Sequence, residues 1–372
     1  MRNMLALLLT LPLLIAACSG ESGTPADGEI RISELPQVRP QMTARVDSAD
    51  TSYFQHLGYK SVPREDGSFV IYDRESGTLF HLDAQAQLLQ RLTRKGRGPG
   101  EVQDITSLME TPEGGLLIYD QRNNKVIRFG SDLAYRDEFT PEPFEGGNLV
   151  SVYPGASDTT YIMRFGTSEW LRDPSEEMDM VLVPYFPESR RYGTSHRMHD
   201  RYFAHRIISD QVVGGMMVPY APTQRIRYHS ASGNLWFHLT GSEEVAEVSV
   251  QLDTLRTIQL NLPGEDLSSV ERDSLRKGVE QQQWETLQED LPDIKAPVDS
   301  LVVGTGGDVW LELNYRGESD RWLVLGDEGE PRYVVHLPKG SLLLHVSPRN
   351  LAVRLDPVTL ALFEGTSSFE SP

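Results

Sequence analysis

Asp66-Gly-Ser-Phe-Val-Ile-Tyr-Asp73 and Glu113-Gly-Gly-Leu-Leu-Ile-Tyr-Asp120 are two copies of one pattern, and the second begins 47 residues after the first. Each copy is a turn that contains glycine, followed by an apolar stretch that ends in Tyr-Asp. The register continues, since Thr78-Leu-Phe-His-Leu82 aligns with Lys125-Val-Ile-Arg-Phe129. Stretches rich in β-branched and aromatic residues between turn residues predict strands, and none of these four stretches has a helical period.

The pattern returns in a looser form later in the chain. Ser232-Gly-Asn-Leu-Trp-Phe237 and Gly306-Gly-Asp-Val-Trp-Leu311 both predict a turn that leads into a strand. A repeat of about 40 to 50 residues with about four short strands is typical of a β-propeller blade. The stretch from about 40 to 365 holds about six such units once a helical insert is set aside. We therefore predict an all-β, six-bladed β-propeller, with seven blades as the alternative.

The helical insert lies near 266–291. Ser268-Ser-Val-Glu271 fits a capping box, in which the Ser and Glu side chains each satisfy a free N–H at the start of a helix. The residues that follow, up to Leu291, are rich in Glu, Gln and Leu, and Pro292 ends the predicted helix. We expect one helix that packs at one end against the propeller and connects two blades; a lid over the central channel is the alternative.

The N-terminus predicts export. Residues 1–17 contain Arg2 and then an apolar stretch shorter than the roughly 20 residues that span a bilayer, which is typical of a signal peptide. Ile15-Ala16-Ala17-Cys18 resembles the lipobox of bacterial lipoproteins, and Cys18 is the only cysteine in the chain. The resemblance implies that the signal peptide is cut before Cys18 and that the cysteine sulfur carries the lipid.

The next segment predicts a tether between the lipid and the folded domain. Residues 18–29 are small, polar and rich in Gly, which is typical of a flexible linker, and residues 30–372 are assigned to the propeller. Ser19 stands where inner-membrane lipoproteins usually carry Asp. We therefore expect the chain in the cell envelope, anchored by its lipid in the outer membrane.

The net charge narrows the class of partner. The formal net charge is −19 at pH 7, which argues against nucleic acid and against electrostatic docking on anionic lipid. A single cysteine allows no intrachain disulfide, so stability has to come from packing between blades. No motif in the chain identifies a cofactor.

A family resemblance rests on Lys95-Gly-Arg-Gly-Pro-Gly-Glu101, which lies between two predicted strands. A turn of this kind resembles the six-bladed β-propeller lipoproteins, which are related to NHL-repeat and TolB-like propellers. The resemblance implies the fold but little about function, because propellers carry many activities. The stretch is not a P-loop, since that motif needs G-x-x-x-x-G-K-[ST] between a strand and a helix. Its glycines instead suit a turn.

Two sets of side chains are candidates for metal chemistry. His196, His199 and His205 form the densest group of imidazoles, and two histidines three residues apart with a third ligand can bind zinc. Their polar, loop-like surroundings favour solvated histidines, so the metal site is the minor interpretation. Asp73 and Asp120 occupy equivalent repeat positions and could line a channel or hold calcium; we favour capping of their own loops.

The irregular middle of the chain is the expected place for function. The region 168–206 breaks the repeat, and long loops on a rigid scaffold often carry binding residues. Aromatic residues there and just beyond could pack between blades or form a ligand face: Tyr185, Phe186, Tyr192, Tyr202, Phe203, Tyr220 and Tyr228. We expect a lipid-anchored, non-catalytic binding or scaffold module for an envelope protein or glycan. The alternative is a metal-dependent hydrolase or lyase of the NHL type that uses the central channel.

Overall fold

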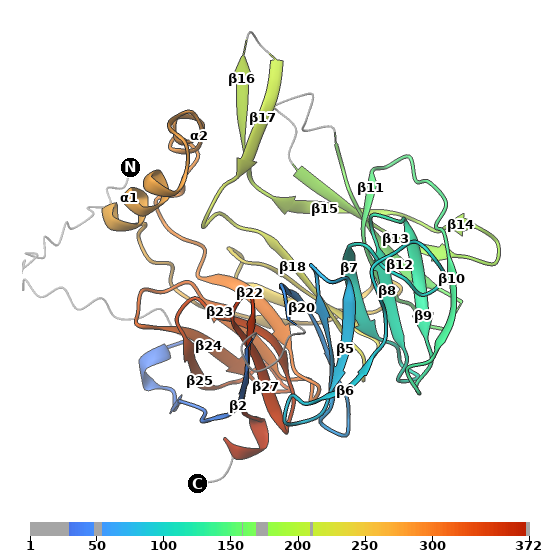
Figure 1. The fold of residues 1–372 in the computed structure, drawn as a ribbon. Coiled ribbons are helices and arrows are strands. Elements are labelled where there is room, and N and C mark those ends of the chain that lie inside the picture. The colour runs from blue at the N-terminus through green and yellow to red at the C-terminus, as the bar shows by residue number, and fades with distance from the viewer. Residues whose placement is uncertain (1–29, 48–53, 158, 169–177, 209–210, 370–372) are drawn as a thin grey trace, which may run out of the picture.

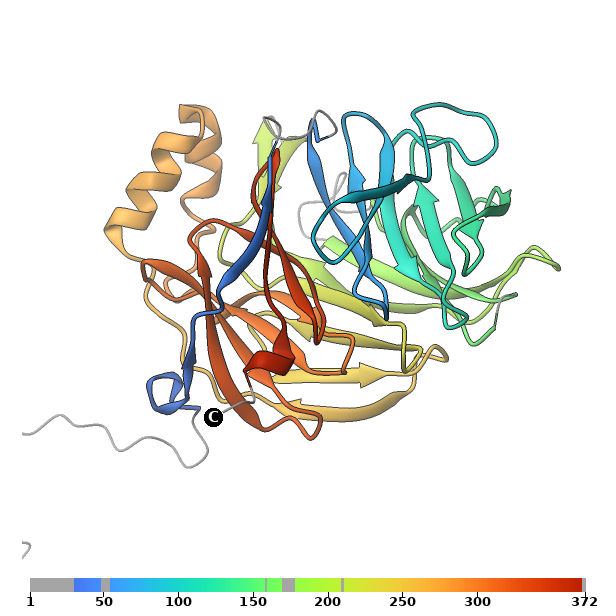
Figure 2. The same cartoon turned by 60° about the horizontal axis from the view of Figure 1, so that its bottom comes forward.

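The computed structural model describes residues 30–47, 54–157, 159–168, 178–208 and 211–369. Within these ranges, six sheets of four or five strands are arranged as the blades of a propeller around a central axis (Figure 1 and Figure 2). Neighbouring strands within a blade are antiparallel, apart from one parallel strand added at an outer edge. The prediction of six blades is confirmed, and the seven-blade alternative is wrong.

The first two blades are the two copies of the sequence repeat. Blade one contains β3 (Leu57–Pro63), β4 (Phe69–Asp73), β5 (Thr78–Leu82) and β6 (Leu88–Arg91). Blade two contains β7 (Ile105–Glu110), β8 (Leu116–Asp120), β9 (Lys125–Phe129) and β10 (Tyr135–Phe139). Every residue of β4 and β8 is buried, because adjacent blades cover both faces of these strands. This explains why their sequences are continuously apolar rather than alternating.

Blades three and four are joined by a projecting hairpin. Blade three contains β11 (Asn148–Pro154), β12 (Tyr161–Gly166) and β13 (Met178–Phe186), with β14 (Arg191–Tyr192) and β15 (His196–Arg201) both paired to β13. The hairpin of β16 (Phe203–Ile208) and β17 (Gln211–Met217) then stands out from the propeller (Figure 1). Blade four contains β18 (Gln224–His229), β19 (Asn234–Leu239), β20 (Glu244–Val248) and β21 (Thr254–Gln259).

The N-terminal segment completes the last two blades. Blade five contains β22 (Val298–Val303), β23 (Val309–Leu313), β24 (Ser319–Leu325) and β25 (Pro331–Pro338), and β1 (Gln37–Val38) pairs with β25 in parallel. Blade six contains β26 (Leu342–Val346), β27 (Asn350–Asp356) and β28 (Thr359–Glu364), and its outer strand is β2 (Met42–Val46). Strands from the two ends of the chain therefore share one sheet and close the ring.

The helical insert differs from its prediction in one respect. The capping box is confirmed, since Glu271 N–H donates to Ser268 Oγ (3.3 Å) and Ser268 N–H donates to Glu271 Oε2 (2.9 Å). The single helix is wrong: α1 (Ser269–Gly278) ends before an extended Val279, and α2 (Gln281–Leu287) begins with a capping box of its own. Glycine at the end of α1 is a poor helix former, which favours the break there.

The insert packs on the projecting hairpin. Its buried Leu287 and Leu291 share a small apolar core with Ala204 of β16 and with Val218, which follows β17. Both elements stand on the same face of the propeller, at the end where the first strand of each blade begins (Figure 1). The insert connects β21 to β22, as expected of an inter-blade connection.

Candidate functional site

The first strand of every blade lines the central channel. Residues of β3, β7, β11, β18, β22 and β26 surround a cavity of about 290 Å³. The lining residues include apolar ones such as Met109 and Leu342 and polar ones such as Ser300. Tyr228 adds a phenol whose buried oxygen has no hydrogen-bond partner among the described residues. Many of the lining residues are polar or charged and stand on strands, so the cavity suits a small polar ligand.

Three cationic side chains from three different blades converge on this cavity. Lys60 comes from β3, Arg164 from β12 and Arg227 from β18, and all three line its wall. The surrounding protein and the positive charges of Arg227 and Arg164 lower the pKa of Lys60 from 10.5 to about 8. Burial and the neighbouring guanidinium groups lower the pKa of Arg227 to about 10. We call these three residues the cationic cluster.

The cationic cluster has few partners within the protein. No described carboxylate forms an ion pair with Lys60 or Arg227, and Arg227 Nη1 donates only to the neighbouring Ile226 carbonyl (2.9 Å). Arg164 Nη2 lies 2.8 Å from Asp200 Oδ1, while its buried Nε lacks an acceptor within the described ranges. Enclosed charges that lack partners cost folding free energy. Their concentration at one place therefore points to a binding role.

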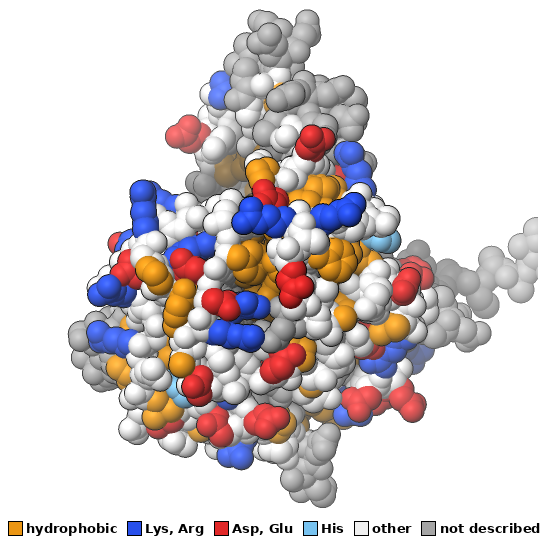
Figure 3. Space-filling view, turned by 90° about the vertical axis from the view of Figure 1, so that its right-hand side faces the viewer, with side chains coloured by type: hydrophobic (Ala, Val, Ile, Leu, Met, Phe, Trp, Pro, Cys, Tyr) orange, Lys and Arg blue, Asp and Glu red, His pale blue; other side chains and the backbone are white. Residues whose placement is uncertain are grey.

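Two further arginines extend the positive charge toward the hairpin end of the channel. Arg201 Nη2 lies 3.3 Å from the same Asp200 oxygen that Arg164 uses, so one carboxylate serves two guanidinium groups. Arg225 Nε donates to the Asp299 carbonyl (2.7 Å), and its Nη2 lies 3.7 Å from Asp299 Oδ1. The side of the molecule in Figure 3 instead shows acidic and basic side chains interspersed. The hairpin end of the channel therefore concentrates positive charge in an acidic chain.

The opposite end of the channel is acidic. A wider cavity of about 820 Å³ lies there, lined by the loops that join the first and second strands of five blades. Its carboxylates are Glu65, Asp66, Glu110 and Glu113, against Arg64 and Arg349. Glu110 Oε1 lies 3.3 Å from Arg64 Nη1, and Ser230 Oγ donates to Glu110 Oε2 (3.0 Å). The channel is thus positive toward one end and negative toward the other.

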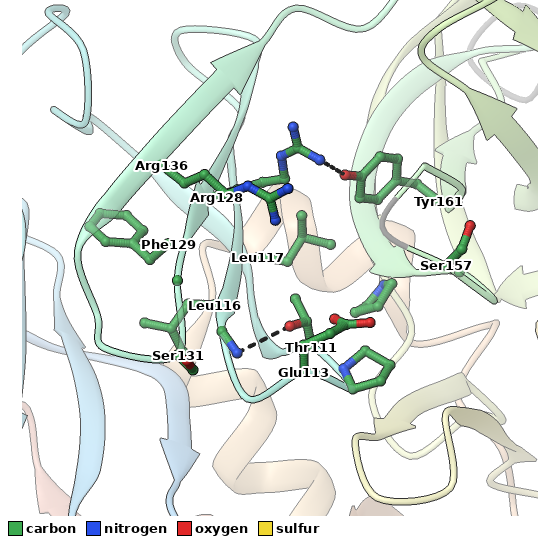
Figure 4. Close-up of a pocket in the computed structure, with 15 residues that line it drawn as sticks. Thr111, Glu113, Leu116, Leu117, Arg128, Phe129, Ser131, Arg136, Ser157 and Tyr161 are labelled. Carbon is green, nitrogen blue, oxygen red and sulfur yellow. Dashed lines mark hydrogen bonds between the residues drawn. The ribbon is translucent and has the colours of Figure 1, made fainter.

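A third cavity, of about 250 Å³, lies between blades two and three (Figure 4). Arg128 is its central charged group, and in Figure 4 its guanidinium reaches the Tyr161 hydroxyl, with Nη1 3.1 Å from Oη. Asp137 binds the same guanidinium through both carboxylate oxygens, at 2.5 and 2.6 Å. Because this charge is already compensated, the cavity is a weaker candidate than the central channel.

The three predicted metal-ligating histidines lie on different surfaces. His196 and His199 are three residues apart on β15, so their side chains leave opposite faces of the strand, and His205 lies on β16. In the part of the chain that the structure describes, no group of three or more His, Cys, Asp or Glu side chains could hold one metal ion. The histidine metal site stays a prediction, and the geometry gives it no support.

Asp73 and Asp120 cap their own loops, which is the interpretation that the sequence favoured. Asp73 Oδ1 accepts the Ser76 N–H of its own loop (2.9 Å), and Asp120 Oδ1 accepts the Asn123 N–H (3.3 Å). Each aspartate also accepts N–H groups from the segment before the first strand of its blade, such as His56 N–H on Asp73 Oδ2 (2.7 Å). Both carboxylates are fully buried. They are structural clamps between loops and do not line the central channel.

The predicted aromatic residues do not form one face. Tyr185 and Tyr192 pack with Phe139 and Phe165 in the core between blades two and three. Tyr228 lines the channel, Tyr220 lies beneath the Lys295 ammonium, and Phe203 begins the hairpin. Phe186 and Tyr202 are exposed. In the irregular region 168–206, residues 169–177 lie outside the described ranges, and the described remainder mostly forms β13, β14 and β15.

Sequence reasoning missed the cationic cluster. One signal was present, because Arg225-Ile-Arg227 alternates charged and apolar residues with the period of a strand. Ile226 enters the core between blades three and four, while both arginines line the channel.

Cys18, the predicted lipid attachment site, lies outside the described residues. No helix that the structure describes is both long and apolar enough to cross a membrane.

Comparison with known proteins identifies no family for the chain. No protein-family model matches the chain, and no curated protein matches it. Among solved structures, a member of the DUF4221 family from Bacteroides vulgatus shares 11% identity, with 84% of this chain and 92% of that chain covered and a TM-score of 0.47. A gluconolactonase from Xanthomonas campestris shares 12% identity (84% and 87% covered, TM-score 0.45). The virginiamycin B lyase of Staphylococcus aureus shares 10% identity (86% and 98% covered, TM-score 0.43).

Two of these structures carry unlike activities in their names, a lactonase and a lyase, and the DUF4221 member carries none. At such identities and TM-scores the likeness carries no argument about activity or ligand. The narrower resemblance to the lipoprotein propellers stays a prediction. The chain is an all-β, six-bladed propeller, and its function has to be argued from its own channel.

Proposed function

We propose that the protein is a non-catalytic binding module whose central channel takes a small anionic ligand with a carboxylate or phosphate group. The observation that carries the proposal is the convergence of Lys60, Arg164 and Arg227 on one cavity with almost no carboxylate partners. Guanidinium and ammonium groups donate charge-assisted hydrogen bonds to such anions, and the lower effective dielectric constant inside a protein strengthens them. The cluster stands on strands, so its geometry is set before the ligand arrives.

The first test is loss of anion binding. Calorimetric titration with malonate and with inorganic phosphate should show binding to the wild-type chain. Lys60→Met and Arg227→Met should each weaken it about tenfold or more, because a hydrogen bond to a charged group contributes about 1.5–3 kcal/mol. Affinity should also fall as the pH rises above about 8, where free Lys60 loses its proton.

The matched control is Arg276→Met, at an exposed position in α1 outside the channel. It removes the same charge and should leave the affinity as it is. Urea unfolding checks the fold of each variant, and Lys60→Met should not lower the midpoint because it relieves repulsion from Arg227 and Arg164. A wild-type chain that binds neither malonate nor phosphate would contradict the proposal. Equal losses in all three variants would contradict it as well.

We also propose that the chain is anchored in the outer membrane of the cell envelope through a lipid on Cys18. The proposal is supported by the lipobox sequence alone. Residues 1–29 lie outside the described residues. Expressed in a bacterium with two membranes, the chain should incorporate labelled palmitate and fractionate with the outer membrane. Cys18→Ser should abolish the label. A labelled Ser variant, or unlabelled wild-type chain, would show the assignment to be wrong.

A further inference from the structure

Lys60 differs from the other five lysines of the chain. Four of those have acceptors: Lys95 Nζ donates to the Glu75 carbonyl, Lys125 pairs with Glu138, Lys295 with Glu265 and Glu271, and Lys339 with Asp320. The fifth, Lys277, is exposed in the last turn of α1. Of the six lysines, only Lys60 lines the channel cavity, and the charged groups that act on it are guanidinium groups rather than carboxylates.

These surroundings change the chemistry of the Lys60 amine. An amine is a nucleophile only when unprotonated, and an ordinary lysine is almost fully protonated at neutral pH. With a pKa of about 8, on the order of one Lys60 in ten is unprotonated at pH 7. The same guanidinium groups that lower the pKa are placed to hold an anionic group beside the amine. The site thus combines a nucleophile with a means of recognising an anion.

We infer that Lys60 reversibly captures small 2-oxo acids as an imine inside the channel, with Arg164 and Arg227 binding the carboxylate. The inference rests on the proposed anion site. The nitrogen of unprotonated Lys60 attacks the carbonyl carbon and forms the C–N bond. Both amine hydrogens end on the carbonyl oxygen, which leaves as water, and a C=N bond remains. The step needs no oxidant or reductant, and hydrolysis reverses it.

Reductive trapping tests the inference. The full chain is incubated with glyoxylate and sodium cyanoborohydride at pH 7, so that any imine is fixed as a secondary amine, and the lysine peptides are quantified by mass spectrometry. Lys60 should be modified at least tenfold faster than Lys277, the internal control in the same sample. Excess malonate, which has no aldehyde or ketone group to react with the amine, should suppress the Lys60 adduct. The Lys60→Arg variant should show no adduct at the corresponding peptide.

The outcomes separate this inference from the proposed function. If malonate binds the channel but Lys60 reacts no faster than Lys277, imine capture is wrong and the anion site stands. If Lys60 reacts fastest but neither malonate nor phosphate binds the channel or protects the amine, the amine is reactive without an anion site, and both capture of oxo acids as stated and the proposed function are wrong. Protection at Lys60 with unchanged labelling at Lys277 supports both.

Discussion

Val46→Asp should lower the free energy of unfolding by at least about 3 kcal/mol, because it places a carboxylate in the apolar core that closes the ring. Val46 is 8% exposed and lies opposite Leu360, in the β2–β28 pair that joins the two ends of the chain. Loss of β2 would leave β28 as an open edge and separate blade six from its outer strand. Urea unfolding followed by circular dichroism measures the effect.

The control for this prediction lies on the same strand. Met42 is 44% exposed at the start of β2, opposite Phe363, so Met42→Asp introduces the same charge where water solvates it. That variant should unfold close to the wild-type midpoint. Similar midpoints for the two variants would mean that burial of Val46 in blade six does not hold the ring closed.

The repeat was predictable because its signal, a glycine turn followed directly by an apolar strand, lies within a few neighbouring residues. The central strands of the first two blades are buried on both faces, and each follows a glycine turn, as at Gly67 and Gly114 with their positive φ. The closing strand offers no such signal. Of β2, only Val46 is buried, and its partner β28 lies more than 300 residues away in the sequence. A strand defined by a distant partner is visible only when the ring is built.

The site was harder to predict than the fold for the same reason. Lys60, Arg164 and Arg227 come from three blades and lie far apart in the sequence, so each alone suggests a solvated charge. They meet only because the blades converge on one axis, where Lys60 and Arg227 stand on first strands and Arg164 on the second strand of blade three. His196 and His199, which are neighbours in sequence, are separated by the alternation of the strand that carries them. Proximity in the sequence predicted a cluster of histidines, whereas the topology produces a cluster of cations.

Acid should destabilise the propeller through two buried histidines. Burial lowers the pKa of both His345 and His238 from 6.5 to about 4. His345 forms hydrogen bonds through both ring nitrogens, Nδ1 with Ser61 Oγ (2.8 Å) and Nε2 with Asn350 Oδ1 (3.0 Å). The Nε2 of His238 is buried without a partner among the described residues. Above pH 6.5 both are neutral in the folded and unfolded chains. As the pH falls below 6.5, both imidazoles become protonated in the unfolded chain but stay neutral in the folded chain. The free energy of unfolding therefore decreases down to about pH 4.

The size of this loss follows from the shift. One pKa unit is about 1.4 kcal/mol, so each histidine should remove about 2–3 kcal/mol between pH 7.5 and pH 4.5. Urea unfolding at the two pH values should show a smaller difference in His238→Gln, and smaller still when His345→Gln is added. Thr240→Val is the control, because it removes a buried hydroxyl that accepts the Thr223 N–H without removing a titrating group. Its unfolding free energy should fall equally at both pH values. If the histidine variants instead keep the full wild-type difference, the acid sensitivity comes from carboxylates, and neutral burial of these two imidazoles does not govern it.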